Sequence, residues 1–228
     1  MSDKEIILEY LRGGSAGELN LSCVDLRGVC LTKANLSGVD LSFSDLSGSN
    51  LIGANLKDTK LKGANFSGAK LLKADLSGAD LSGANLTDAD MCDVKLINAN
   101  LMEVRLVNAN LTQANMTSAS LLYSNLTGAV LVGVNLSYAN LSYANLSFVN
   151  LSNANLTFVH LTDVKLTGAN LSGTDFSKAD MNETDLLKVS LTKPISRIPI
   201  FLRLFGIMQL RRSQSSITQH ERFISKRE

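Results

Sequence analysis

Few residues of this chain have the type and spacing that catalysis or metal binding requires. The two histidines, His160 and His220, lie far apart in the sequence. The three cysteines, Cys23, Cys30 and Cys92, have neither the spacing of metal ligands nor the even number of a disulfide framework. The sequence contains no nucleophile elbow, phosphate-cradling glycine loop or dinucleotide fingerprint. We therefore expect no catalytic residue, no cofactor and no metal, in a protein that is not an enzyme.

Charge and composition also limit the classes of protein to which this chain can belong. The 228 residues carry a net charge of +1, so no overall field directs the chain to nucleic acid or anionic lipid. The charge is −2 in residues 1–18, −2 in 19–193 and +5 in 194–228. Free thiols fit a reducing cytosol, the N-terminus is too short and charged for a signal peptide, and no apolar run reaches membrane-spanning length. We expect a cytoplasmic protein.

A five-residue repeat dominates the sequence. From Leu21 to Leu191 every fifth residue, 35 in all, is Leu, Met or Phe, and we call this position the centre. The residue two before it is always Ala, Val, Ser or Thr from Val24 to Val189, and the residue just before it is Asn or Asp in 25 of 35 repeats. Residues five apart diverge by about 140° on a helix and point to opposite faces of a straight strand. Each repeat must therefore contain a short extended step and a turn.

Glycine marks the position of that turn. All 12 glycines of the repeat region follow a centre by two residues, and seven more of these positions are Asn or Asp. These residue types tolerate the positive φ that a type II turn needs at its third position. The centre and the small residue are predicted to point inward and the Asn or Asp between them outward, with backbone bonds to coils above and below. The repeat thus predicts an all-β solenoid.

The repeats resemble those of a known family. Runs such as ANLSGVDLSFSDLSG (34–48) and ANLSYANLSFVNLSNANL (139–156) closely resemble the pentapeptide-repeat proteins, particularly bacterial and cyanobacterial members. The resemblance implies a right-handed quadrilateral parallel β-helix with four repeats, or ~20 residues, per coil. It assigns residues 19–193 to a rod about 42 Å long, at ~4.8 Å per coil.

Both ends of the chain predict helices. Residues 1–18 open with a capping box and resemble the short helix that precedes many bacterial members, so we expect an N-terminal capping helix and lead-in. Residues 194–228 predict a basic amphipathic helix over 199–212 and a loose tail. The residues expected to act there are Ile200, Phe201, Leu204, Phe205, Met208, Arg211 and Arg212. Three roles stay open: capping the last coil, pairing end to end with a second copy, or binding an anionic membrane.

Aromatic residues replace the usual turn residue six times. Five of these are Tyr123, Tyr138, Tyr143, Phe148 and Phe158, and the sixth is Phe43. With the four sides per coil that the resemblance implies, Tyr123 stacks on Tyr143 and Tyr138 on Phe158, while Phe148 occupies another side. Two interpretations stay open. The rings either replace glycine by stacking alone or form a docking patch for a partner protein.

The leading hypothesis is a non-enzymatic scaffold, a rigid rod that docks on an unknown partner protein as a monomer or an end-to-end homodimer. The resemblance also allows a DNA mimic that modulates DNA gyrase, but duplex DNA carries about one negative charge per 1.7 Å, far more than this rod. A third hypothesis is a peripheral membrane adaptor acting through the C-terminal helix. Lys57, Lys60, Lys62, Lys70 and Lys73 lie among Asn and Asp, so we expect no nucleic-acid partner.

Overall fold

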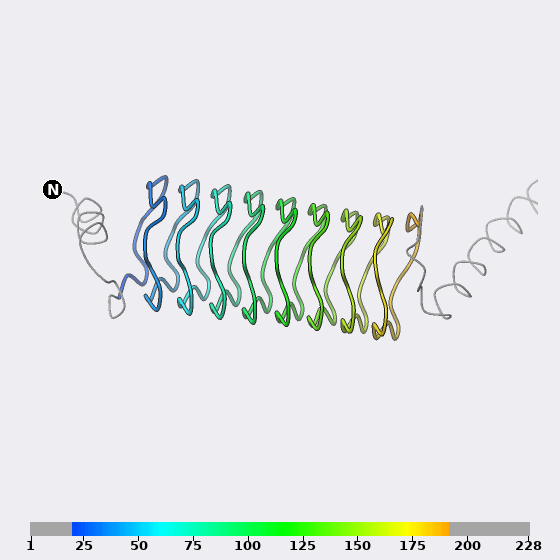
Figure 1. Cartoon of the computed structure of the whole chain (residues 1–228). Coiled ribbons are helices and arrows are strands. Elements are labelled where there is room, and N and C mark those ends of the chain that lie inside the picture. Colours follow the sequence, from blue (N-terminus) through cyan, green and yellow to red (C-terminus); the bar gives the residue numbers. More distant parts are fainter. Residues whose placement is uncertain (1–19, 192–228) are drawn as a thin grey trace, which may run out of the picture.

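The computed structural model describes residues 20–191, and Figure 1 shows them as a straight rod of stacked coils. The predicted N-terminal helix and all residues named above for the C-terminal helix lie outside the described residues. Within 20–191 there is no helix and no strand longer than a single bridged residue. Each repeat is one bridged residue followed by a turn, as the five-residue period requires.

The turn adopts the predicted backbone conformation. In all 34 repeats from residue 23 to residue 188, the residue two after the centre has positive φ, between 54° and 73°. Twelve of these residues are glycine and 22 are not. The left-handed region costs a non-glycine residue about 1 kcal/mol or more, so the fold imposes this conformation even where the side chain disfavours it. The position in the repeat therefore determines the positive φ, and glycine occupies only some of these positions.

Every backbone N–H of a typical repeat has an acceptor. In residues 126–130 two N–H groups bond to the following coil, one bonds to the preceding coil, and one closes the turn. The remaining N–H, that of Thr127, bonds to the side-chain Oδ1 of Asn125 at 3.0 Å. The other four acceptors are the carbonyl oxygens of Asn145, Ser147, Ala109 and Leu126, at 2.8, 3.0, 2.9 and 2.9 Å. The Asn or Asp before the centre thus satisfies the one donor that neither coil nor turn can reach.

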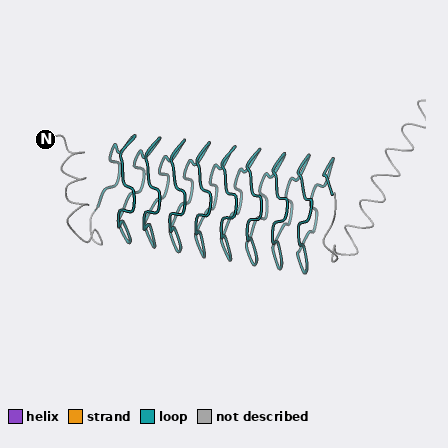
Figure 2. Cartoon of the chain, turned by 45° about the horizontal axis from the view of Figure 1, so that its top comes forward, coloured by secondary structure: helices purple, strands orange, loops and turns teal. Residues whose placement is uncertain are grey.

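The coils have four sides. Parallel bridges join each Asn/Asp-position residue to the residue 20 further on, from Asn20↔Asp40 to Asn170↔Ser190. This register confirms four repeats per coil, and Figure 2 shows successive coils in line along the rod. We call the side whose middle residues are 20, 40 and so on to 180 side A, and the sides centred 5, 10 and 15 residues later sides B, C and D. Each corner is named by the two sides it joins.

The interior is one continuous hydrophobic core. Every centre from Leu21 to Leu186 is buried, with at most 5% of its surface exposed, so the leucines share one interior as predicted. Each buried centre contributes on the order of 1.5–3 kcal/mol before ordering entropy is subtracted. Where the small inward residue is polar, its hydroxyl can donate to a backbone carbonyl, as Ser44 does to Leu41 at 2.6 Å and Thr59 to Leu36 at 3.0 Å. Only small residues fit beside the centre where the chain bends.

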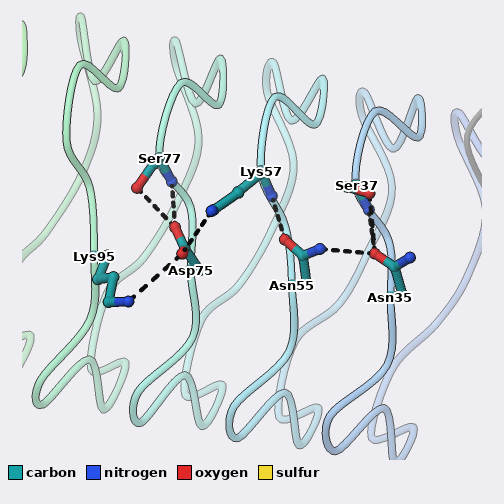
Figure 3. A network of polar contacts seen from close by, with 7 residues as sticks. All are labelled: Asn35, Ser37, Asn55, Lys57, Asp75, Ser77 and Lys95. Carbon is teal, nitrogen blue, oxygen red and sulfur yellow. Dashed lines mark hydrogen bonds and ion pairs between the residues drawn. The ribbon is translucent and has the colours of Figure 1, made fainter.

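Asn and Asp side chains also bond to each other along the rod. On side D, Asn55 Nδ2 donates to Asn35 Oδ1 at 2.8 Å, and Asp75 accepts from both the N–H and the hydroxyl of Ser77 (Figure 3). Lys57 and Lys95 lie 3.4 and 3.8 Å from Asp75 Oδ2. Along this part of side D, the outward polar groups are therefore neutral or paired.

Two carboxyl groups on the sides of the rod, those of Asp75 and Asp40, have a lowered pKa. Partial burial raises the pKa of Asp75, but the hydrogen bonds from Ser77 and the charge of Lys57 outweigh it, so the net pKa is lowered. The hydroxyl and the N–H of Ser42, with the charge of Lys60, likewise lower the pKa of Asp40. A lowered pKa in the folded state stabilises the fold above the unfolded value, about 3.9, and this stabilisation is lost as the pH falls through the folded value.

We expect Asp75→Asn to flatten the acid side of the stability profile. Asn keeps the Oδ1 acceptor for Ser77 but cannot pair with a lysine, so the variant should lose less stability than the wild type as the pH falls below about 4. Urea unfolding at several pH values measures this. Asp175→Asn, on the same side, is the control, because the described structure shows no ion pair for Asp175. Identical acid profiles for Asp75→Asn and the wild type would contradict the assignment.

Candidate docking face

The corners place the predicted aromatic residues on the surface. All five have positive φ, from 57° to 62°. The exposed fractions are 67% for Phe148, 57% for Tyr138, 56% for Tyr123, 49% for Tyr143 and 37% for Phe158. The corner geometry turns these side chains away from the core, and all five residues keep at least 37% of their surface exposed.

Four of the five rings form two stacks that border one side of the rod. Tyr123 and Tyr143 stack at corner AB with centroids 5.0 Å apart and planes 13° apart. Tyr138 and Phe158 stack at corner DA at 4.8 Å and 8°. Both predicted stacks are therefore confirmed. Between them lies side A, and we call these four rings, together with the side A residues Ser120, Asn140 and His160, the aromatic face.

Phe148 does not belong to this face. It lies at corner BC, where the structure shows no aromatic partner for it in the described part of the chain. Its ring covers Gly168 of the next coil, because a Cβ at Gly168 would lie 2.7 Å from ring atom Cδ1. Phe43 covers Gly63 in the same way. The predicted five-residue patch thus divides into a group of four and one separate ring.

Folding stability alone gives little reason for these rings. A non-glycine residue in the left-handed region costs about 1 kcal/mol or more, so each stack begins with two such costs. Stacking of an aromatic pair contributes about 0.5–1.5 kcal/mol beyond the area that the rings bury, and these rings bury only about half of their surface. Lys178 adds a cation–π contact, with Nζ 4.7 Å from the Phe158 centroid. The structure leaves aromatic surface in water that the solenoid does not require.

The aromatic face lies within a long uncharged stretch, which the five-residue pattern does not reveal. Residues 106–162 contain no Asp, Glu, Lys or Arg. They span nearly three coils, and a simple scan of charge along the chain would have revealed them. Outside this stretch charges are frequent, for residues 20–191 hold 12 basic and 15 acidic side chains. A surface that combines exposed rings with missing charge has the composition of an interface core.

The residues with reactive chemistry lie outside any such arrangement. Within residues 20–191 no group of three His, Cys, Asp or Glu side chains could hold a metal ion. Cys23 and Cys92 are free thiols, and burial, with the carboxylates of Asp93 and Asp90, raises the pKa of Cys92 and disfavours its reactive thiolate. His160 is exposed, as predicted from its outward position. In the described part of the chain no helix could span a membrane.

The fold and this surface define a class, a four-sided β-solenoid with a continuous hydrophobic core and an outer surface of corner and side residues. The sequence model of the family described as "Pentapeptide repeats" matches in eight copies between residues 20 and 193. The chain therefore belongs to the pentapeptide-repeat family, whose fold is a right-handed β-helix.

Solved structures agree on the fold. Trypsin-treated QnrB1, a plasmid-mediated fluoroquinolone resistance protein, aligns with a TM-score of 0.61 at 22% identity, over 76% of this chain and 89% of that one. A pentapeptide repeat protein of the Arabidopsis thaliana thylakoid lumen is 45% identical over 45% of this chain and 71% of that one, with a TM-score of 0.44 that supports no inference. No curated protein sequence matches the chain. The likeness to QnrB1 shows the fold and nothing finer.

We expect Gly168→Ala to destabilise the protein more than Gly83→Ala. Both glycines have positive φ, +71° and +67°, so both changes carry the backbone cost. Only the Cβ at residue 168 meets a ring, and displacing Phe148 from its rotamer should add about 0.5–1.5 kcal/mol. Urea unfolding of the two variants measures the difference. Adding Phe148→Ala should remove the excess, and an unchanged excess in that double variant would show that the ring is not its cause.

Proposed function

We propose that this protein is a non-enzymatic, cytoplasmic interaction scaffold that docks its aromatic face on a partner protein. The observation that carries the proposal is the pair of aromatic stacks flanking side A within the uncharged stretch. Tyrosines supply large contact areas with one polar end, and exposed aromatic clusters are where binding energy concentrates in interfaces. The family membership supports a scaffold, since the solenoid is built from repeats and not around a catalytic cleft.

The rigidity of the rod favours docking. Each coil is bonded to its neighbours through regular backbone hydrogen bonds, and the rings are held at fixed corners by the register of 20 residues. A preorganised surface loses little conformational freedom when a partner binds. Binding along a flat side also blocks whatever surface of the partner it covers. Steric or competitive docking is therefore the mechanism that we propose.

We expect Tyr138→Asn or Tyr143→Asn to weaken binding of the cellular partner about tenfold or more, the loss typical of a central interface ring. Asn tolerates the left-handed conformation, so the fold should survive. The measurement is affinity purification from the source cell with the full chain, followed by titration of the captured protein. The control is Phe43→Asn, an exposed ring at the same kind of corner but distant from the face. Equal binding by all three variants would remove the aromatic face as the docking site.

The alternative of a DNA mimic acting on DNA gyrase has less support. Such a mimic needs about one negative charge per 1.7 Å of its axis. The described rod has a net charge of −3 and an uncharged stretch nearly three coils long, where a mimic would need its phosphate equivalents. We expect micromolar protein to leave gyrase supercoiling of plasmid DNA unchanged. Inhibition or protection in that assay would restore the alternative.

Three further proposals have less support than docking through the aromatic face: the capping helices, the end-to-end homodimer and the membrane adaptor. Each depends on segments outside the described residues, whereas the aromatic face is made entirely of described side chains.

A further inference from the structure

The middle coil of the aromatic face places two rings on either side of one amide. Tyr138 at corner DA and Tyr143 at corner AB flank Asn140, the side A residue between them. Ser142, which shares this strip, is only 9% exposed, whereas the two tyrosines are 57% and 49% exposed. A strip of small polar residues thus lies between two more exposed aromatic side chains.

Asn140 has an uncommitted hydrogen-bond donor. Its Oδ1 accepts the backbone N–H of Ser142 at 3.0 Å. Elsewhere on side A the amide nitrogen of an asparagine is used along the rod, as Asn100 Nδ2 donates to Asp80 at 2.9 Å. Ser120 lies 20 residues before Asn140, and the described structure gives Asn140 Nδ2 no protein acceptor. Together with the two tyrosine hydroxyls, this nitrogen lets the centre of the face donate hydrogen bonds to a ligand.

The backbone of this repeat offers a ligand no donor. From Tyr138 to Tyr143 all six N–H groups are bonded, five to backbone carbonyls and that of Ser142 to Asn140 Oδ1. A β-strand that extends a sheet needs free N–H groups as well as free carbonyls on its neighbour. An α-helix uses its own backbone groups internally and docks on a continuous apolar surface, which the polar strip interrupts. A strand and a helix therefore both match the face poorly.

The charges around the face favour an uncharged ligand. Side A and its two corners carry no charge between Glu103 and Asp163. At the two ends acidic and basic side chains occur in the same coils: Glu103, Asp163, Asp180 and Glu183 with Arg105, Lys165 and Lys178. A charged ligand would meet both signs there, so neither sign gains a clear electrostatic advantage.

The face has room for a segment of chain but not for a domain. Its three coils extend about 14 Å along the rod, and one side of five residues is at most about 17 Å wide. The resulting flat area, about 240 Å², is well below the roughly 800 Å² that each partner of a stable protein pair covers. A second copy docked through this face alone would therefore not form a stable dimer.

A polyproline II helix satisfies these conditions. It has no internal hydrogen bonds, so its carbonyl oxygens are free to accept from the face, and its prolines have no N–H that needs an acceptor. Aromatic surfaces are what such proline-rich segments dock on. A turn of three residues rises about 9.3 Å, close to the ~9.6 Å of two coils, so every third ligand residue meets an equivalent level of the face. The 14 Å of the face hold about five residues of such a ligand.

We propose that the aromatic face binds an uncharged, proline-rich segment of its partner protein, in the polyproline II conformation and aligned with the rod. Asn140 Nδ2 donates to a ligand carbonyl, and Tyr138 and Tyr143 contact proline rings on either side of that bond. Leu122, partly exposed in the preceding coil, extends the apolar contact. This inference rests on the proposed function and adds the class of segment that the face recognises.

Titration of the full chain with a blocked decaproline peptide tests the proposal, with tyrosine fluorescence as the readout. The chain has no Trp and four tyrosines, three of them on the face, and the peptide has none. We expect a saturable change with a Kd below about 1 mM. A glycine–serine peptide of the same length should bind about tenfold more weakly or less, because it loses more conformational freedom. Absence of saturation with decaproline, or equal binding of the two peptides, would overturn the proposal.

Asn140→Asp and Asn135→Asp form a matched pair for the same titration. Both asparagines accept the N–H of the serine two residues later, at 3.0 and 3.1 Å, and Asp keeps this acceptor. Both changes add one negative charge, but Asn135 lies on side D. Asn140→Asp should weaken decaproline binding about tenfold or more, because an acceptor replaces the donor, and Asn135→Asp should leave it unchanged. Equal affinities of the two variants would overturn the contact.

Failure of this inference is distinguishable from failure of the proposed function. Capture of the cellular partner that depends on Tyr138 and Tyr143, without any binding of decaproline, would overturn the polyproline class and keep the aromatic face as the docking site. Capture that is independent of these tyrosines would remove the face and this inference together.

Discussion

The backbone hydrogen bonds between neighbouring coils, which set a register of 20 residues, are the constraint on which this structure depends. A five-residue segment cannot pair its own backbone groups, so each coil must be held by its neighbours. The bonds between coils fix the register, and the register requires a corner with positive φ in every repeat, whatever residue occupies it. Tyrosine, lysine and glutamate all adopt the left-handed conformation here because the alternative is to leave backbone donors of two coils without partners.

This constraint also organises the surface. Because every residue lies directly beside the one 20 positions later, side chains far apart in sequence form columns, and neighbouring columns form sides. Tyr123 and Tyr143 become one stack and Tyr138 and Phe158 another, on either side of the same strip of small polar residues. The surface gains exposed aromatic rings by substitution at corners while the core stays almost uniform. Such a scaffold allows recognition to change without a change of fold.

Much of the fold could be predicted from the sequence because the pattern is redundant. The inward centres, the positive φ after each of them and the exposed position of His160 all follow from one five-residue rule. The number of sides did not follow from the period and came from the family resemblance, since four sides depend on how the corners bend. The second function of the Asn or Asp position does not follow from the repeat pattern. Asn125 was expected only to point outward, whereas its Oδ1 accepts the N–H of Thr127.

The sequence by itself determined which residues are buried, where the chain turns and which aromatic residues reach the surface, because the five-residue repeat sets the period at which large side chains point inward and the chain bends. The tertiary structure decided which surface residues are neighbours. Tyr143 and Tyr138 border a common side while Phe148 lies apart, although all three are close in sequence. Two surface residues of a solenoid are neighbours when their positions differ by about one coil, here 20 residues. The length of a coil depends on how the chain closes and forms hydrogen bonds with the next coil.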